Sequence, residues 1–330
     1  MMNHGNIVSQ FTAWATQQQQ SIAAGKPYLL GEMAAVGPQG LAEITDVFGC
    51  ALWSLDFFMY SATLNVTRVL MHMTDIGNQS AWQPITIGDI APWVRPAYYG
   101  HIVTSTLIGP GNDTTIAEID VRSQELQDYA GRASAYVVYR GNQIYAAVVI
   151  NLKEFNQTMT ESSSTQLNFT LNIPPGYAGN NLTVYKLSAP GADSFKGVTW
   201  AGLNFQTDDG LPTSAATNDT SFVTVSQGGH LSVLVRDTQA AVIIFNTSSP
   251  VILQSPSSQS PGSSGTNPSS TAAATASSTS SSASVAGSSS SAANSTSGSG
   301  SKSSAEKADV PGVVFLVTSL CVCMAIILNF

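Results

Sequence analysis

The fold is decided by residues 25–72, which open with GKPYLLGE (25–32) and close with VTRVLMH (66–72). Residues 28–30 are a short apolar run of strand length, and the closing run has the composition of a buried strand. Between these runs, over residues 41–64, apolar side chains recur every three or four positions, which predicts a long helix. The stretch therefore predicts a strand, a helix and a second strand.

Two further helices are predicted on either side of this stretch. Residues 7–24 carry apolar side chains near one face and end before Gly25 and Pro27, which stop a helix. Pro96 stands at a favourable helix start. The side chains expected to line that helix are Tyr98, Tyr99, Ile102 and Leu107. Strands that alternate with helices pair in parallel through right-handed crossovers, and two strands do not close a barrel. We therefore expect residues 1–108 to be the end of a larger α/β domain.

The sequence changes to short β-rich runs from about residue 114, with turn signals such as RGN (140–142) between them. The runs are 114–121, 133–140, 143–152, 165–173, 181–187, 221–226, 230–236 and 241–245. Roughly eight strands at this spacing predict an antiparallel β-sandwich. We assign residues 109–247 to this second domain, so that the fold class is α/β followed by all-β.

The next segment, residues 248–309, is built from Ser, Ala, Thr, Gly and Pro, and no charged residue occurs between Thr238 and Ser301. Such a chain buries too little apolar surface to offset its ordering entropy. Its Ser, Thr and Pro content is typical of an O-glycosylated stalk. We expect a disordered spacer here.

The last segment, residues 310–330, is hydrophobic and uncharged to its end. A transmembrane helix and a GPI-attachment signal both fit this pattern. The polar spacer KSSAEKAD (302–309) and the small residues before it favour the GPI signal, since no polar flank follows the tail. The candidate attachment residues are Gly298, Ser299 and Gly300. We expect a protein anchored to the outer face of the plasma membrane or to the cell wall, in a fungal setting.

Asn-x-Ser/Thr triplets support the same location, because their density indicates a surface adapted to the secretory pathway. They begin at Asn65, Asn78, Asn112, Asn156, Asn168, Asn181, Asn218, Asn246 and Asn294. The opening residues MMNHGNIVSQFTAW contain no signal peptide. Internal initiation or unconventional targeting would explain this, but we favour a sequence that has lost its beginning.

Charge and cysteine content exclude several classes of function. The net charge is −8 with no basic run, which argues against nucleic acid as a partner. The three cysteines, Cys50, Cys321 and Cys323, form neither a disulfide scaffold nor a zinc-ligand pattern. We expect no metal and no cofactor.

Glu32 is the strongest candidate for chemistry, because it closes an apolar strand just before a turn and a long helix. In a parallel α/β barrel the carboxyl ends of the strands face the active site, so a carboxylate there would point at a substrate. A Glu at this position also fits a helix cap or a rim ion pair, and position alone leaves both open. Trp53 and Asp56 lie mid-helix, where we expect packing for Trp53 and a cap or a pairing partner for Asp56.

A family resemblance bears on this choice. MNHGNI (2–7), GKPYLLGE (25–32), TDVFGCALWSLDFFMYSATLNVTRVLMH (45–72), WQP (82–84) and the PxYYG pattern (96–100) together resemble the last third of a family 79 glycoside hydrolase. That family contains the β-glucuronidase-like and heparanase-like enzymes. The resemblance is close up to about residue 108 and loose over the β-rich runs. It implies a (β/α)8 barrel, of which this chain would hold the last units, followed by a C-terminal β-sandwich.

The resemblance implies that Glu32 is the nucleophile of a retaining glycosidase, which sets two carboxyl groups about 5–5.5 Å apart. The acid/base of the family follows an Asn-Glu pair on an earlier strand, and every other Glu of this chain follows Glu32. We therefore expect the chain by itself to be inactive. His72 would bond a sugar hydroxyl and Tyr98 and Tyr99 would flank the sugar, although a core histidine and helix packing explain these three equally well.

One departure bears on specificity. The resemblance implies a Gly- and Tyr-containing loop after His72 that would hold a glucuronate carboxylate, and here the loop reads MTDIGNQSAW (73–82). We expect a carbohydrate substrate and a retaining hydrolase reaction of the β-glucuronidase type. The alternative is a non-catalytic, GPI-anchored glycan-binding or cell-wall protein.

Overall fold

The computed structural model describes residues 1–245, except 38, 112, 122–126 and 218, together with residues 324–327. The expected stalk therefore lies outside the described residues, as do the anchor candidates Gly298, Ser299 and Gly300. Four of the glycosylation asparagines lie outside them as well, namely Asn112, Asn218, Asn246 and Asn294.

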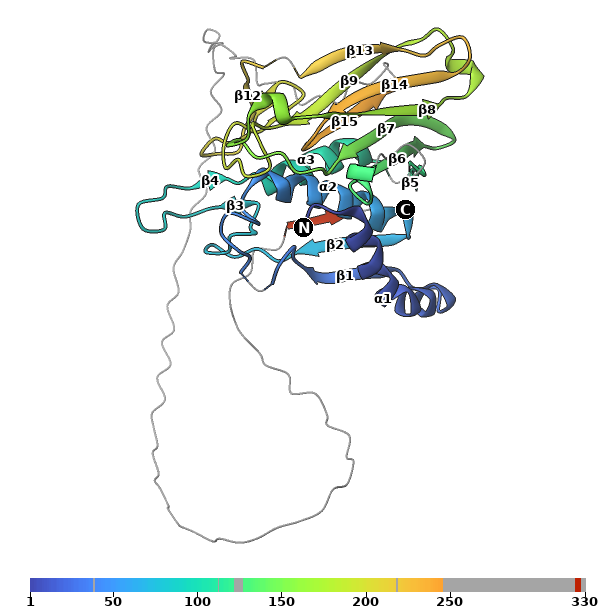
Figure 1. Ribbon diagram of the computed structural model, residues 1–330. Helices are drawn as coiled ribbons and strands as arrows, with labels where there is room; N and C mark the ends of the chain where they lie inside the picture. The colour runs from blue at the N-terminus through green and yellow to red at the C-terminus, as the bar shows by residue number, and fades with distance from the viewer. Residues whose placement is uncertain (38, 112, 122–126, 218, 246–323, 328–330) are drawn as a thin grey trace, which may run out of the picture. The chain divides into compact units, whose positions relative to one another are not determined.

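The first part of the chain alternates helices and strands in the predicted order (Figure 1). Its elements are α1 (His4–Ala23), β1 (Tyr28–Met33), α2 (Phe48–Thr63), β2 (Val66–Met71) and α3 (Ala97–Ile108). The strands β1 and β2 pair in parallel, as the alternation predicted. The described residues contain no closed barrel; β2 pairs on its other side, antiparallel, with β16 (Met324–Ile327).

The helix predicted over residues 41–64 is wrong at its beginning, because α2 starts at Phe48. Residues 42–47 form turns and bends instead. The Thr45 hydroxyl donates to Leu41 O and accepts from Leu41 N, and Glu43 has a left-handed backbone with φ of 62°. Leu41 and Ile44 are exposed, so the apolar spacing there does not mark a buried face.

All eight predicted β-rich runs form strands, and together with three short strands that were not predicted they build the β domain, residues 114–245. A nine-stranded sheet contains β5 (Thr114–Glu118), β6 (Ala133–Arg140), β7 (Gln143–Asn151), β15 (Gln239–Ile244), β9 (Asn181–Ser188), β13 (Thr220–Thr224), β10 (Thr199–Trp200), β11 (Leu203–Asn204) and β12 (Thr213–Ser214). A second, two-stranded sheet pairs β8 (Gln166–Asn172) with β14 (His230–Arg236). Within both sheets every pairing is antiparallel.

Both faces of the nine-stranded sheet are buried, each in a separate core. One face packs on β8 and β14, whose alternate residues Leu167, Phe169 and Leu171 point into that core. The other face packs on α2 and α3, which lie between this sheet and β1–β2 (Figure 1). All but two of the 16 residues of α2 are buried. The α/β part and the β domain thus share one continuous core, and the predicted boundary at residues 108/109 stays a prediction.

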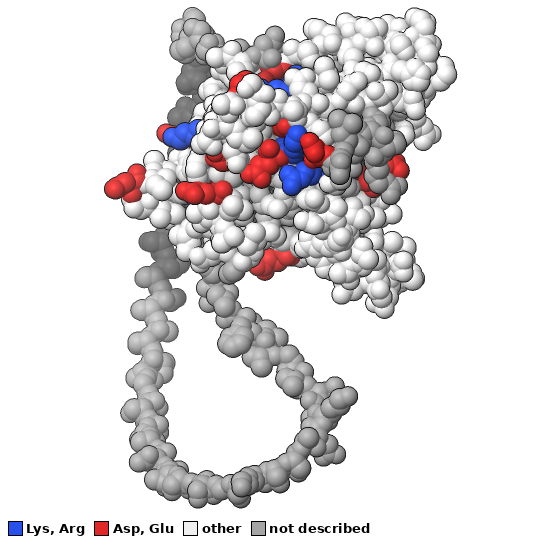
Figure 2. All heavy atoms as spheres, in the orientation of Figure 1, with Lys and Arg blue, Asp and Glu red and all other residues white. Residues whose placement is uncertain are grey.

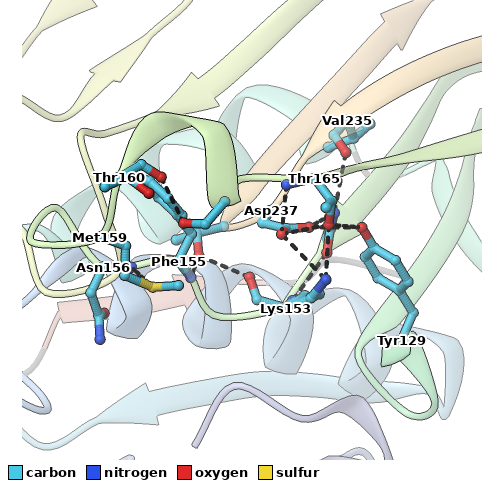
Figure 3. A network of polar contacts seen from close by, with 12 residues as sticks. Tyr129, Lys153, Phe155, Asn156, Met159, Thr160, Thr165, Val235 and Asp237 are labelled. Carbon is cyan, nitrogen blue, oxygen red and sulfur yellow. Dashed lines mark hydrogen bonds and ion pairs between the residues drawn. The ribbon is translucent and has the colours of Figure 1, made fainter. Parts of the chain in front are cut away.

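A polar network fixes one end of the β domain (Figure 3). The buried Asp237 accepts hydrogen bonds from the Tyr129 hydroxyl at 2.9 Å and from Asn151 Nδ2 at 3.2 Å. Its other oxygen accepts from the backbone and hydroxyl of Thr165, and Lys153 Nζ lies 3.6 Å away. Because each carboxylate oxygen has donors, this buried charge is compensated. The network joins the ends of β7, β8 and β14.

The described part of the hydrophobic tail is the strand β16, and the rest of residues 310–330 lies outside the described residues. Among the described helices, none is both long and apolar enough to cross a membrane. Figure 2 shows a face of the molecule on which most side chains are uncharged. Acidic side chains are scattered over this face, some of them apart from any basic one, and the few basic side chains form no broad basic surface.

Candidate active site

The candidate active site lies at the carboxyl ends of β1 and β2. Because these strands are parallel, their ends meet at the same edge of the sheet, and the backbone N–H of His72 donates to Met33 O at 2.8 Å. This register brings the side chains of Glu32 and His72 together. His72 Nδ1 lies 2.9 Å from Glu32 Oε1, a distance typical of a charge-assisted hydrogen bond.

The two side chains of the pair differ in exposure. The Glu32 side chain is 74% exposed, whereas that of His72 is 18% exposed. The strands hold the pair in place through buried neighbours, Leu30 in β1 and Val69 and Met71 in β2. An oriented carboxylate with one oxygen bonded and an open approach is a suitable nucleophile, and the imidazole fixes its direction.

The two tyrosines predicted to flank a sugar lie elsewhere, in α3 against the β domain. The Tyr99 hydroxyl donates to Val198 O at 2.8 Å and accepts from the backbone N–H of Phe205 at 2.8 Å. Tyr99 is fully buried, so its side chain presents no surface to a ligand. Tyr98 is partly buried and its ring lies 6.5 Å from that of Phe205. The structure thus brings Glu32 and His72 together and places the tyrosines in helix packing.

A second group of ionisable residues was not predicted as a group. His4 of α1 lies between two carboxylates, with Nδ1 at 3.1 Å from Asp56 Oδ2 and Nε2 at 3.0 Å from Glu118 Oε1. Asp56 is fully buried and also accepts hydrogen bonds from the hydroxyls of Ser134 and Tyr136. Asp56, expected to cap or pair within the barrel, pairs with His4 of α1 and with two hydroxyls of the β domain. His4 and Asp56 both occur in the quoted runs, but no spacing signal links them to each other or to Glu118.

The charge balance of this group is set by burial and by its carboxylates. Burial lowers the pKa of His4, but the hydrogen bonds and charges of Asp56 and Glu118 outweigh burial and raise this pKa to about 10. His4 is therefore an imidazolium at neutral pH. The pKa of the Tyr136 hydroxyl is raised by burial and by the charge of Asp56, so it remains a donor. These contacts join α1, α2 and the nine-stranded sheet.

The described glycosylation triplets lie on the surface to different degrees. Asn65, Asn168 and Asn181 are exposed, and Asn78 and Asn156 are partly buried.

Cys50 is a buried free thiol in α2, and burial raises its pKa to about 12. Among the described residues, no group of three or more His, Cys, Asp or Glu side chains is arranged to hold a metal ion.

Comparison with known proteins gives this arrangement a family context. Residues 135–242, which lie within the β domain, match the model of the glycosyl hydrolase family 79 C-terminal beta domain. The predicted resemblance to glycoside hydrolase family 79 is confirmed. A β-glucuronidase of Aspergillus niger is 28% identical over 264 residues, which are 74% of this chain and 46% of that protein. A β-glucuronidase of Neurospora crassa is 27% identical over 287 residues, 74% of this chain and 50% of that protein.

A solved structure shows the same fold. The 4-O-α-L-rhamnosyl-β-D-glucuronidase of Fusarium oxysporum 12S superposes with a TM-score of 0.59 and 21% identity, over 74% of this chain and 49% of that one. The chain spans about half the length of the curated relatives it matches. The strand-end position of Glu32 and His72 lies in the part of the chain before the matched β domain.

Proposed function

We propose that this chain forms part of a retaining glycoside hydrolase of the β-glucuronidase type, in which Glu32 is the nucleophile. The observation that carries the proposal is the Glu32–His72 pair, an exposed carboxylate oriented by an imidazole at the ends of two parallel strands. The two β-glucuronidase relatives and the family 79 β domain support the choice of reaction. The substrate class is an extracellular glycan.

The proposed chemistry uses the two ends of the pair differently. The ionised Glu32 attacks the anomeric carbon and forms a covalent glycosyl-enzyme as the glycosidic bond breaks. His72 orients the Glu32 carboxylate through the contact of its Nδ1. In a retaining mechanism a second carboxyl protonates the leaving oxygen and then takes the proton of the attacking water. Glu32 takes the nucleophilic role alone, and no residue of this chain is assigned the proton-transfer role.

We also propose that the protein acts outside the cell, held there by a lipid anchor attached at Gly298, Ser299 or Gly300. The exposed asparagines Asn168 and Asn181 support glycosylation and hence a secretory route. Treatment of intact cells with a phosphatidylinositol-specific phospholipase should release the protein into the medium. A mature protein whose C-terminal peptide still contains Cys321 and Cys323 would show a retained span instead.

Covalent labelling tests the nucleophile directly. A 2-deoxy-2-fluoro-β-D-glucuronyl fluoride carries a leaving group that departs without protonation, so labelling requires a nucleophile and a sugar site but no acid. We expect mass spectrometry to find the label on Glu32 in the peptide that contains YLLGEMAAVG. The Glu32→Gln variant should take up no label.

The matched control is Glu43→Gln, which changes an exposed carboxylate in the loop after β1. This variant should label at the rate of the unchanged protein. A label on Glu43 or Asp46 would remove Glu32 from the mechanism. Absence of any label, combined with measurable binding of glycans, would favour the non-catalytic glycan-binding alternative.

A further inference from the structure

A second candidate binding site lies on the side of the β1–β2 sheet to which the carboxyl ends of its strands point. A cavity of about 680 Å³ is lined by residues from the β1–α2 loop, the β2–α3 loop and two loops of the β domain. The volume is within the range of about 300–1,000 Å³ that is typical of ligand sites. Because the first two loops follow β1 and β2, they leave the sheet at the edge that carries Glu32 and His72.

Two charged residues are built into the wall of this cavity. Asp46 is 8% exposed and Arg95 is 5% exposed, and both line the cavity. Asp46 Oδ1 has no hydrogen-bond partner among the described residues, which is rare for a buried carboxylate oxygen. Arg95 donates to Gln83 Oε1 at 2.9 Å and to Ser80 O at 3.4 Å, which leaves further N–H groups of its fork for a ligand.

An aromatic surface and amide groups complete the wall. Strands β3 (Trp82–Gln83) and β4 (Trp93–Val94) form a hairpin. Trp93 of β4 is partly exposed, and the Arg95 guanidinium lies 5.7 Å from the centroid of the Trp93 ring. The β domain contributes Asn204, at the end of β11, and Gln206, in the loop that follows it. The Gln206 amide donates to Phe195 O at 2.6 Å, so this side of the wall is fixed. An aromatic face beside paired donors and acceptors suits a sugar ring, which has an apolar face and a rim of hydroxyls.

The charges that line the cavity favour a neutral ligand over an anion. Three carboxylates, Asp46, Asp89 and Asp208, accompany Arg95 and Lys196, so acidic groups outnumber basic ones. We propose that this cavity, between the loop after β2 and the β domain, is a subsite for neutral sugar units of a glycan. The choice of ligand class rests on the proposed function. The protein would then bind several units of an extended glycan rather than a single terminal sugar.

Binding of three neutral tetrasaccharides, cellotetraose, xylotetraose and β-1,6-galactotetraose, tests the site by calorimetry with the full chain. We expect at least one to bind, and Trp93→Ala to weaken that binding about tenfold through loss of the aromatic face. The matched control is Trp82→Ala, since Trp82 lies on the partner strand of the same hairpin, is 40% exposed and does not line the cavity. This variant should bind as the unchanged protein does.

A measurement on the unchanged protein covers the case in which Trp93→Ala fails to fold. The bound tetrasaccharide should slow hydrogen exchange in residues 89–95 and 195–208 and leave β13 unaffected. Three results would contradict the subsite. The first is that none of the three tetrasaccharides binds, and the second is that Trp93→Ala and Trp82→Ala lose equal binding affinity. The third is that the bound tetrasaccharide slows hydrogen exchange in other segments instead. Labelling of Glu32 by the fluoro sugar, measured on the unchanged protein, keeps the two proposals apart: labelling without tetrasaccharide binding overturns the subsite, and tetrasaccharide binding without labelling overturns the nucleophile.

Discussion

His4 Nδ1 lies 3.1 Å from Asp56 Oδ2, and this contact connects the first turn of α1 to the middle of α2. Glu118 of β5 contacts the other ring nitrogen at 3.0 Å. One imidazolium thus compensates a fully buried carboxylate and joins three elements that are distant in sequence. Removal of one member of such a pair leaves the other charge buried without a partner.

His4→Gln should therefore lower the free energy of unfolding by about 3–5 kcal/mol at pH 6. The pKa of His4 is about 10 in the folded protein against 6.5 as its ordinary value, so protonation stabilises the fold fully below pH 6.5. This contribution falls as the pH rises from 6.5 toward 10. Urea denaturation of both proteins at pH 6, 7.5 and 9 should show a shrinking difference. His230→Gln, at an exposed histidine of β14, is the control, and a difference that is constant with pH would contradict the assignment.

His72→Ala should slow the labelling of Glu32 by the fluoro sugar about tenfold or more, because the carboxylate loses the group that orients it. Since Glu32 is exposed, the ion pair itself should contribute less than about 1 kcal/mol to the free energy of unfolding. Labelling kinetics and urea denaturation separate the two effects. Unchanged labelling with lower stability would make His72 a structural residue.

Asp237→Ala should lower the free energy of unfolding by about 3–5 kcal/mol, because the donors of Tyr129, Asn151 and Thr165 would lose their acceptor (Figure 3). Thermal or urea denaturation measures the loss. Asp128→Ala, at an exposed aspartate beside Tyr129, should change this free energy by less than about 0.5 kcal/mol. Equal effects of the two substitutions would show that the network contributes nothing specific.

Gly100→Ala should lower the free energy of unfolding by about 1–3 kcal/mol, because α3 packs against α2 too closely for a side chain here. An added Cβ would lie 2.7 Å from Ser54 Cβ and 2.8 Å from Ala51 O. Gly176→Ala is the control, since an added Cβ there meets no atom within 4 Å. A neutral Gly100→Ala would mean that the two helices separate easily.

Local sequence patterns were sufficient to predict the order and type of the main elements. Apolar periodicity and turn residues act over a few positions, so they were sufficient for the alternating helices and strands and for the eight β-rich runs. The same reasoning failed over residues 41–47, where apolar spacing continues but the backbone turns at Glu43. The spacing of apolar residues along the sequence does not indicate whether another element packs against them and buries them.

The tertiary structure alone decided which polar groups meet. Glu32 was recognisable from its strand-end position, but its contact with His72 depends on the parallel register of β1 and β2. The groups around Asp56 come from α1, β5 and β6, and those around the cavity come from four loops. Such contacts are set by long-range packing of buried faces, which brings distant segments together at distances that no local pattern encodes.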